Sequence, residues 1–499
     1  MLPTCCRSSF RFVLLSTLLL VSLLAVARSL GRNPSALEQI DLLVDIRHEI
    51  VTQYAETPDQ QKMAQEAVRA MVGALDDPYT VYLSPEELEP FDKLVHGTFS
   101  GIGAEVDIHD DRLRIVTPLD GSPAVKAGVM AGDIVLQIDG VSTEGMKITD
   151  AIKRLTGPQG TQVTIKVRHP SGAEADLSIT RAQINVQTVR GVRRGAEQKW
   201  DYMLDRQAGI GYIRLSQFTE KTPGEVRAAL DELLAQNVKG LIVDVRFNPG
   251  GLLDAAVQIA DMFLPADKTI VSVRGRVVPE QAFKSTNGGT IPDMPIVVLA
   301  NEASASASEV LAGALADNGR AKFIGTRTFG KGSVQQVFKL DGGQGALKIT
   351  NAYYYLPNGR NIHRRKDATV WGVDPDDGFY VTMTFDQVTE MVRLRSEADV
   401  LRPGDAAAQG ATLTPEMIRK DRADPQLAAA LEAILGKLRG GDWPKVGQSD
   451  AQALVRRTQR ENLLRQRDAM QDRIAQINKE LGRLDKGQAI TTEEETDRE

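Results

Sequence analysis

Between residues 205 and 380 the chain alternates short apolar runs with segments of helical character. The runs at 241–245 and 296–300 are almost wholly apolar, and each is followed by a helical pattern. Because strands that alternate with helices form a largely parallel sheet covered by helices, this region predicts an α/β layer. Ligands of such sheets bind beyond the carboxyl ends of the strands, so the loops after these two runs are the first candidate functional segments.

Three other regions differ in character from this layer. Residues 97–183 contain short β-rich runs separated by Gly, Pro and Asp, with one short helix at 148–155, and predict a compact β-rich module. Residues 35–75 have helical spacing that Pro58 splits into two helices. Residues 385–499 are charged and helix-prone, and they end in an acidic run.

One segment of the C-terminal region has a coiled-coil pattern. Apolar residues recur there in a 4-3-4-3 rhythm, at Met470, Ile474, Ile477, Leu481 and Leu484. The pattern covers barely two heptads. A helix packed on its own domain is therefore the preferred interpretation, with a coiled coil as the alternative.

The first residues of the chain have the features of a targeting signal. Arg7 and Arg11 precede an uncharged apolar run at 12–27, which ends in a small-residue cleavage pattern. The run is short for a membrane span, which needs about 20 residues. We therefore expect a protein that is exported to the periplasm or another extracytoplasmic space, with an uncleaved anchor as the alternative. Removal of the signal would also remove Cys5 and Cys6, so the mature protein would have no cysteine.

The composition limits the chemistry that the chain can perform. Its 42% hydrophobic and 25% charged residues are ordinary for a globular protein, and the net charge of −6 argues against nucleic-acid binding. With five His and two Cys in 499 residues, a zinc site is not expected. We expect no metal and no other cofactor.

The loop after Ala300 contains three serines, Ser304, Ser306 and Ser308, at the start of a predicted helix. A serine at such a junction presents its hydroxyl beside free backbone N–H groups, which can stabilise a developing oxyanion. The alternative is that these serines only cap the helix.

A serine nucleophile needs a base, and histidine is scarce in this region. No histidine lies between His169 and His363, and His363 falls in a polar, basic loop. Lys331 is a candidate base because Gly330 and Gly332 allow an unusual backbone path around it. Free lysine titrates near ~10.4, so a base that works near neutral pH needs a perturbation of about 4 kcal/mol, which burial can supply.

We expect Phe329 and Val334 to desolvate Lys331. Two other interpretations of this loop are a solvated surface lysine and a phosphate-binding loop, although the full P-loop spacing is absent. In the loop after the other central strand, Gly250 and Gly251 permit close approach of a ligand and offer backbone N–H groups to an oxyanion. The alternative there is a simple turn that enters a helix.

Together, these three motifs resemble those of the carboxyl-terminal processing peptidases, or tail-specific proteases, which are Ser/Lys-dyad serine endopeptidases. The resemblance covers residues 35 to 380 and includes two further motifs, 356–360 and 372–376. It implies an α/β catalytic core of the crotonase-like or ClpP-like type with an inserted PDZ domain. The expected regions are a signal or anchor at 1–27, a helical region at 35–95, the PDZ domain at 97–183, the peptidase core at 195–380 and a helical region at 385–499.

The resemblance also assigns roles to single residues. It implies that Ser306 is the nucleophile, that Lys331 is the general base and that Gln335 orients the lysine. The oxyanion would be held by backbone N–H groups of Ala307 and of the turn at 250–251. The chain departs from the family at Phe247, where an asparagine is usual, so a side-chain role at this position is not carried over.

The β-rich module resembles a PDZ domain. Gly101, Ile102 and Gly103 match the loop that binds a peptide carboxylate, and the turns at 121–124 and 132–135 match those that follow it. A PDZ groove takes up a peptide as an added strand and holds its C-terminal carboxylate on backbone N–H groups. Without the resemblance, a β-rich spacer would be the simpler interpretation.

The expected function is cleavage of proteins near their C-terminus through an acyl-enzyme, with the PDZ domain binding unstructured substrate tails. The expected partners are such substrates, a second copy of the chain and a regulator at the C-terminal helices. The competing classes are a non-catalytic PDZ scaffold and a hydrolase of small acyl substrates. Whether the PDZ domain activates or inhibits is open at this level.

Overall fold

The computed structural model describes most of the chain after its first 33 residues. The described residues are 34–88, 98–109, 112–119, 122–130, 132–185, 187–194, 199–286, 291–366, 368–399, 412–449 and single positions between 456 and 482. The predicted targeting segment at 1–27 lies outside them. None of the described helices is both long and apolar enough to span a bilayer. The chain divides into two compact units, residues 1–84 and 85–499.

The N-terminal unit contains the two predicted helices. They are α2 (Pro34–Gln53) and α3 (Gln60–Gly73), followed by the short strand β1 (Val81–Leu83). Asp59 caps α3 by accepting a hydrogen bond from the Lys62 N–H at 2.9 Å. Several large apolar side chains of α2 are exposed, namely Ile40, Leu42, Leu43, Val44, Ile46 and Ile50.

The β-rich module forms an antiparallel sheet in the order β3-β4-β5-β7-β8. The bounds are β3 (Ala104–His109), β4 (Arg112–Pro118), β5 (Ile134–Ile138), β7 (Gln162–Arg168) and β8 (Glu174–Thr180). Helices α5 (Pro123–Lys126) and α6 (Ile148–Leu155) pack on it, and β6 (Val141–Ser142) pairs with β5. Strands β2 (Thr98–Gly101) and β9 (Ala182–Asn185) pair with each other where the module begins and ends.

The predicted α/β layer is built on a sheet in the order β10-β14-β15-β18-β19. The bounds are β10 (Val189–Arg190), β14 (Ile210–Leu215), β15 (Gly240–Asp244), β18 (Ile296–Ala300) and β19 (Lys322–Gly325). The last four strands are parallel, as predicted. Strand β13 (Met203–Asp205) pairs with β14 in the antiparallel sense, and β11 (Arg193–Arg194) pairs with β12 (Trp200–Asp201) apart from this sheet.

Helices cover both faces of this sheet, which explains why its central strands are mostly apolar. One face packs on α7 (Thr222–Ala235), α8 (Leu253–Asp261) and α9 (Ala307–Asp317). The other face packs on α11 (Pro415–Asp421) and α12 (Pro425–Leu438). Neighbouring residues of β15 point to opposite faces, because Val243 belongs to the first core and Ile242 to the second.

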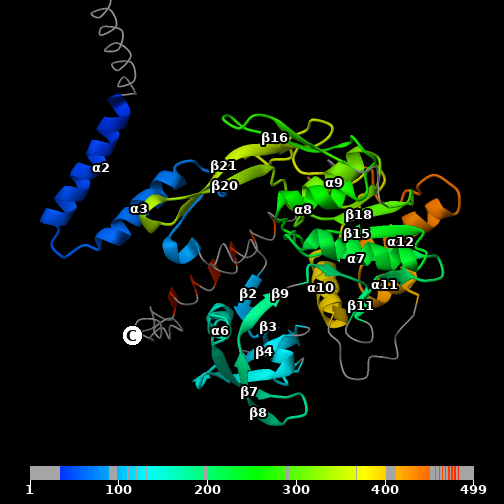
Figure 1. Cartoon of the computed structure of the whole chain (residues 1–499), viewed down its shortest axis with the longest axis horizontal. Coiled ribbons are helices and arrows are strands. Elements are labelled where there is room, and N and C mark those ends of the chain that lie inside the picture. Colours follow the sequence, from blue (N-terminus) through cyan, green and yellow to red (C-terminus); the bar gives the residue numbers. More distant parts are fainter. Residues whose placement is uncertain are drawn as a thin grey trace, which may run out of the picture. The chain divides into compact units, whose positions relative to one another are not determined.

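A second sheet lies beside α8 and α9 and contains the segment that follows the candidate lysine. Its strands are β16 (Thr269–Arg274), β17 (Gln281–Lys284), β20 (Ser333–Lys339) and β21 (Ala346–Tyr355). Strands β20 and β21 form a long antiparallel ribbon, which Figure 1 shows leaving the core. The short 3₁₀ helix η2 (Asp341–Gly343) connects them.

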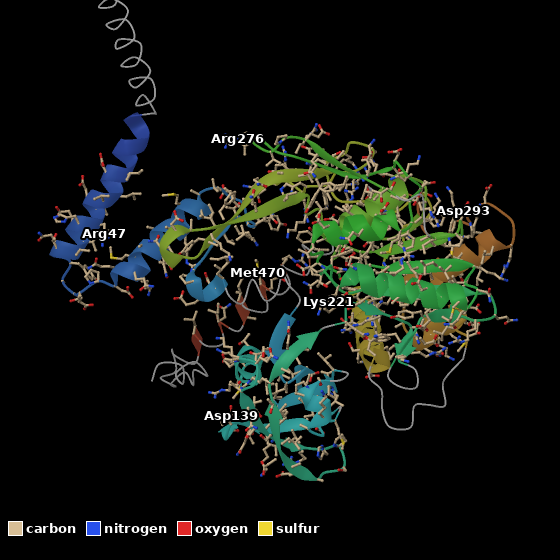
Figure 2. The ribbon with its side chains drawn as sticks, viewed as in Figure 1. Arg47, Asp139, Lys221, Arg276, Asp293 and Met470 are labelled. Atoms are coloured by element: carbon tan, nitrogen blue, oxygen red, sulfur yellow. The ribbon has the colours of Figure 1, made fainter. Side chains whose placement is uncertain are left out.

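The C-terminal region is helical, as expected. It contains α10 (Phe385–Asp399) in addition to α11 and α12. Met470, Ile474, Ile477 and Leu481 are helical but 42% to 67% exposed, and Met470 is labelled in Figure 2. The preferred interpretation, that this seam packs on its own domain, is therefore wrong for these four residues. Leu484 lies outside the described residues.

Candidate active site

Ser306 stands at the junction of β18 and α9, where the backbone takes an uncommon conformation. Its φ is 55° and its ψ is −116°, a strained arrangement for a residue with a side chain, which costs about 1–3 kcal/mol. The Ser306 N–H donates to Glu309 Oε2 at 2.8 Å, and the neighbouring Ala305 N–H donates to the Asn248 carbonyl at 3.0 Å. These bonds hold the strained turn in place.

The other two serines of this loop have structural partners. The Ser304 hydroxyl donates to the Val245 carbonyl at 2.8 Å, and the Ser308 hydroxyl donates to the Asn248 carbonyl at 2.9 Å. Both side chains are fully buried, whereas Ser306 is 6% exposed. Ser304 and Ser308 therefore fasten the loop to the turn that follows β15. This geometry favours Ser306 as the reactive member of the three.

The glycine turn lies against the candidate nucleophile. A Cβ added to Gly250 would lie 2.6 Å from the Ala305 carbonyl oxygen and 2.8 Å from Ser306 Cβ, so a side chain has no room there. The φ values of Gly250 and Gly251, 99° and 145°, also require glycine. The turn therefore packs directly against Ser306, and its predicted close approach to a ligand stays a prediction.

The two glycines differ in the availability of their N–H groups. The Gly250 N–H already donates to Asn248 Oδ1 at 2.9 Å. Among the described residues, the N–H groups of Gly251 and Ala307 have no acceptor; Ala307 begins α9, where such free donors are expected. The N–H groups of Gly251 and Ala307 are therefore available to an oxyanion, whereas the N–H group of Gly250 stabilises the turn.

Lys331 lies in the loop between β19 and β20. Burial lowers the pKa of Lys331, the positive charge of Lys348 lowers it further, and Glu309 opposes both effects. Both flanking positions require glycine. A Cβ on Gly330 would lie 2.6 Å from the Trp371 ring, and a Cβ on Gly332 would lie 2.5 Å from the backbone nitrogen of His363. The environment therefore shifts the lysine in the direction that a general base needs.

One expectation about this loop was wrong. Phe329 does not form a buried wall for Lys331, because it is 43% exposed. Its ring instead lines a cavity of about 140 Å³ together with Phe247 and Trp371. Val334 is partly buried against the core that contains α9, and its part in the desolvation of Lys331 stays a prediction.

Gln335 connects the two strands of the ribbon. Its Nε2 donates to the Ser333 hydroxyl at 2.9 Å and to the Thr350 hydroxyl at 3.2 Å. Ser333 comes directly after the Gly-Lys-Gly loop, so Gln335 stabilises the exit from that loop. Its role in orienting the Lys331 side chain stays a prediction.

Glu309 joins the serine and lysine segments and was not singled out by the sequence. Its Oε2 accepts from the Ser306 and Lys331 N–H groups, both at 2.8 Å. Its Oε1 accepts from the Thr328 hydroxyl at 2.6 Å and from the Gly330 N–H at 2.7 Å. The side chain is fully buried, and burial raises the pKa of Glu309 to about 7 although all four hydrogen bonds oppose the rise. A signal was present, since Ser-x-x-Glu at a helix start is the capping-box pattern.

A buried ionic network around Arg246 supports the turn that follows β15. Arg246 donates to Asp244 Oδ2 at 2.7 Å, to Asp424 Oδ1 at 2.7 Å and to Gln426 Oε1 at 3.1 Å. Burial alone would raise the pKa of Asp244, but Arg246 and Arg395 together hold it below its usual range. Because Asp424 caps α12 through the Leu427 N–H, this network connects the second helical layer to the glycine turn.

The predicted carboxylate loop of the β-rich module follows β2. Ile102 is buried, and its carbonyl accepts from the Ala124 N–H at 2.8 Å. The N–H groups of Ile102 and Gly103 have no acceptor in the described part of the chain. An apolar groove runs on from this loop between β3 and α6, lined by Ala104, Val106, Ile152 and Leu155. Free N–H groups at the end of such a groove are what capture of a peptide C-terminus requires.

Comparison with known proteins identifies two families within the chain. Residues 209–378 match the model of peptidase family S41, and residues 114–169 match that of the PDZ domain. A carboxy-terminal-processing protease of Bartonella bacilliformis is 34% identical over 446 residues, which cover 87% of this chain and 97% of the relative. A carboxyl-terminal-processing protease of Synechocystis is 36% identical over 70% of this chain and 80% of its own length.

A solved structure of a photosystem II D1 C-terminal processing protease is 31% identical over 68% of this chain and 86% of that chain, with a TM-score of 0.41. The relatives establish the family, because more than one exceeds 30% identity and is matched over most of its length. The chain therefore belongs to the carboxy-terminal processing proteases of peptidase family S41, serine proteases that act on proteins, and it contains a PDZ domain.

Proposed function

We propose that the protein cleaves its substrates near their C-terminus with Ser306 as nucleophile and Lys331 as general base. One observation carries this proposal: the Ser306 and Lys331 N–H groups donate to the same oxygen of Glu309, each at 2.8 Å. Two segments that are 25 positions apart are thereby fixed next to each other. The lowered pKa of Lys331 supports the role of the lysine as base.

The reaction has two stages. Neutral Lys331 takes the proton of the Ser306 hydroxyl while Ser306 Oγ bonds to the peptide carbonyl carbon, and the carbonyl oxygen becomes an oxyanion beside the N–H groups of Gly251 and Ala307. The C–N bond then breaks, and protonated Lys331 gives its proton to the leaving amine. Water, with Lys331 again as base, hydrolyses the acyl-enzyme and restores Ser306.

The PDZ domain supplies substrate selection in this proposal. An unstructured tail adds as a strand along β3, with its carboxylate on the N–H groups of Ile102 and Gly103. Amidation of the C-terminus of a model peptide removes the carboxylate charge and should raise KM while kcat is preserved. An unchanged KM for the amidated peptide would contradict carboxylate capture by this loop.

The dyad is tested by substitution and by covalent labelling. Ser306→Ala and Lys331→Ala should each abolish cleavage of a tailed substrate and labelling by a fluorophosphonate probe, while the melting temperature is kept. Ser308→Ala is the matched control, because its hydroxyl bonds to the Asn248 carbonyl, and this variant should still label at Ser306. Mass spectrometry of the labelled peptide identifies the serine. Full activity of Lys331→Ala would exclude the dyad.

Ser306→Ala also offers a way to find the substrates. A variant that binds tails but does not cleave them should retain them in a pull-down, with the trapped proteins identified by mass spectrometry. Wild-type protein treated with the fluorophosphonate probe is the control for binding without turnover.

Export and association complete the proposal. The apolar segment at 12–27 would direct the chain to an extracytoplasmic space, which N-terminal sequencing of the purified protein tests. The exposed apolar residues of α2 would pair two copies, and Met470, Ile474, Ile477 and Leu481 would bind a regulatory partner or a second copy. Light scattering of the full chain measures the association state.

A further inference from the structure

A small cavity lies between α10, the end of α11 and the central sheet. Its volume is about 30 Å³, which gives room for about one or two particles of the size of a water molecule. Neither Ser306 nor Lys331 lines it. The charged side chains that line it are Arg214, Arg395, Asp399, Arg422 and Asp424. What this cavity can hold depends on the balance of these charges.

Both carboxylates that line the cavity are already paired with arginines. Arg214 donates to Asp399 Oδ1 at 2.6 Å, and Arg190 donates to Asp399 Oδ2 at 3.0 Å. Both oxygens of Asp424 accept from Arg246, at 2.7 Å and 2.8 Å. The negative charge of the two acids is therefore spent on arginines other than Arg422.

Arg422 has no carboxylate partner among the described residues. Its Nη1 donates to the Val192 carbonyl at 3.2 Å, and its remaining guanidinium N–H groups have no acceptor in the part of the chain that the structure describes. Arg395 is also weakly paired, because its Nη2 lies 3.4 Å from Asp244 Oδ2 and 3.5 Å from Asp424 Oδ2. The cavity thus contains donors that no protein group satisfies.

The charges around the cavity do not cancel. Three arginines and two aspartates line it, and the buried pair of Arg246 and Asp244 behind it is neutral, so one positive charge is in excess. Burial lowers the pKa of Arg422, and the charges of Arg193 and Arg395 act in the same direction. Arginine nevertheless stays protonated in proteins, so the excess cannot be removed by loss of a proton. A buried charge without a counter-charge is unfavourable, and an anion would relieve it.

We propose that this cavity binds one small monovalent anion of the halide type, with chloride as the simplest example. The anion accepts from the free N–H groups of Arg422 and balances the one excess positive charge. It also connects three elements, because Arg422 follows α11, Arg395 belongs to α10 and Arg214 belongs to β14. The volume favours a halide over a larger oxyanion.

The alternative occupant is water. Water also accepts from arginine N–H groups, but it brings no charge and leaves the excess in place. The two occupants therefore differ in how the stability of the protein depends on the kind of salt. An anion that binds the folded state raises its stability with concentration, whereas a cavity that holds water responds only to ionic strength.

Thermal unfolding of the full chain in sodium chloride and in sodium gluconate, at equal ionic strength, separates these occupants. Gluconate is too large for the cavity. We expect chloride to raise the melting temperature by about 2–4 °C over gluconate once it exceeds its Kd tenfold. Bromide should act like chloride.

Arg422→Gln removes the unpaired charge and should abolish the difference between chloride and gluconate. Arg419→Gln is the matched control, because Arg419 lies three positions earlier, is 45% exposed and pairs with Glu432 at 2.6 Å. This control should keep the wild-type response. A chloride response that persists in Arg422→Gln, or that is lost equally in Arg419→Gln, would overturn the proposal.

A second measurement needs no variant. Wild-type crystals grown in sodium bromide, measured at the bromine absorption edge, should show an anomalous peak in the cavity beside Arg422. A cavity that holds water alone under these conditions would contradict the anion site. Neither experiment depends on Ser306 or Lys331, so the result is independent of the proposed dyad.

Discussion

Glu309 accepts four hydrogen bonds with a carboxylate that has no contact with solvent. Three of its donors are backbone N–H groups, so the residue fixes the course of the main chain at the segments of Ser306 and Lys331. A carboxylate suits this position because both of its oxygens accept. An amide of the same shape would turn an N–H toward donors.

Glu309→Gln should therefore disable the enzyme without unfolding it. The amide NH₂ replaces one oxygen and leaves two buried donors unpaired, at about 1–3 kcal/mol each. We expect a loss of at least 10-fold in both kcat and fluorophosphonate labelling, with a modest fall in melting temperature. Glu302→Gln, in the same loop but exposed, is the control. A labelling rate equal to wild type would show that Glu309 does not position the dyad.

Lys348 offers a test of the lysine base through pH. Its positive charge contributes to the lowered pKa of Lys331, so Lys348→Gln should raise that pKa. In the proposed mechanism neutral Lys331 is the active form, so activity should rise with pH through the lysine pKa, and the variant should move this rise to higher pH. Lys339→Gln in β20 is the control on the same ribbon. A pH profile of kcat/KM that does not move would contradict the role of Lys331 as base.

The sequence pointed to the serine loop after Ala300 and to Lys331, and the resemblance to the family singled out Ser306 among the three serines. It could not place Glu309 in the site. The donors to Glu309 at Gly330 and Lys331 come from a loop about 20 positions away, and only the fold brings that loop to the start of α9.

At the level of elements, α12 and the turn after β15 are connected through Arg246. The guanidinium is fully buried between Asp244 and Asp424, so each carboxylate partly compensates the charge that burial would penalise. Loss of one partner leaves an uncompensated buried charge. The turn that carries Gly250 and Gly251 would then lose its support.

We predict strong coupling between Arg246 and Asp424. Asp424→Ala should destabilise the fold by about 3–5 kcal/mol, the usual cost of breaking a buried ion pair. It should also slow fluorophosphonate labelling. In a double-mutant cycle, Arg246→Ala combined with Asp424→Ala should cost less than the sum of the single changes by about 0.5–3 kcal/mol. Strict additivity of the unfolding free energies would show that the two residues act independently. Glu416→Ala, on α11, is the exposed control.

The sequence predicts the buried strands of the sheet but not the placement of every helix that covers them. The continuous apolar runs at 241–245 and 296–300 indicated strands buried on both faces. The helices of the first face follow those strands in the chain and could be placed with them. The helices of the second face come more than 100 residues later. Their sequence predicts helices but contains no sign of the surface that they cover.

At the scale of the whole molecule, helices α11 and α12 share a hydrophobic core with the central sheet and are part of the peptidase core. A chain that ends after residue 449 keeps α11 and α12 and should fold and label with the fluorophosphonate probe. A chain that ends after residue 411 loses both helices and exposes the face of the sheet that contains Ile242, Val297 and Leu299. We expect this shorter chain to be insoluble or unfolded by circular dichroism. A soluble, probe-reactive chain ending at 411 would refute this dependence.

The position of α12 also has a consequence for the order in which the protein becomes active. Synthesis proceeds from the N-terminus. Ser306 and the lysine loop are therefore made about 100 residues before α12, the helix that covers the second face of the sheet. A nascent chain lacks the Asp424 partner of Arg246 until this late stage. The turn at Gly250 and Gly251 thus gains its buried support only after α12 has been made and has folded onto the sheet.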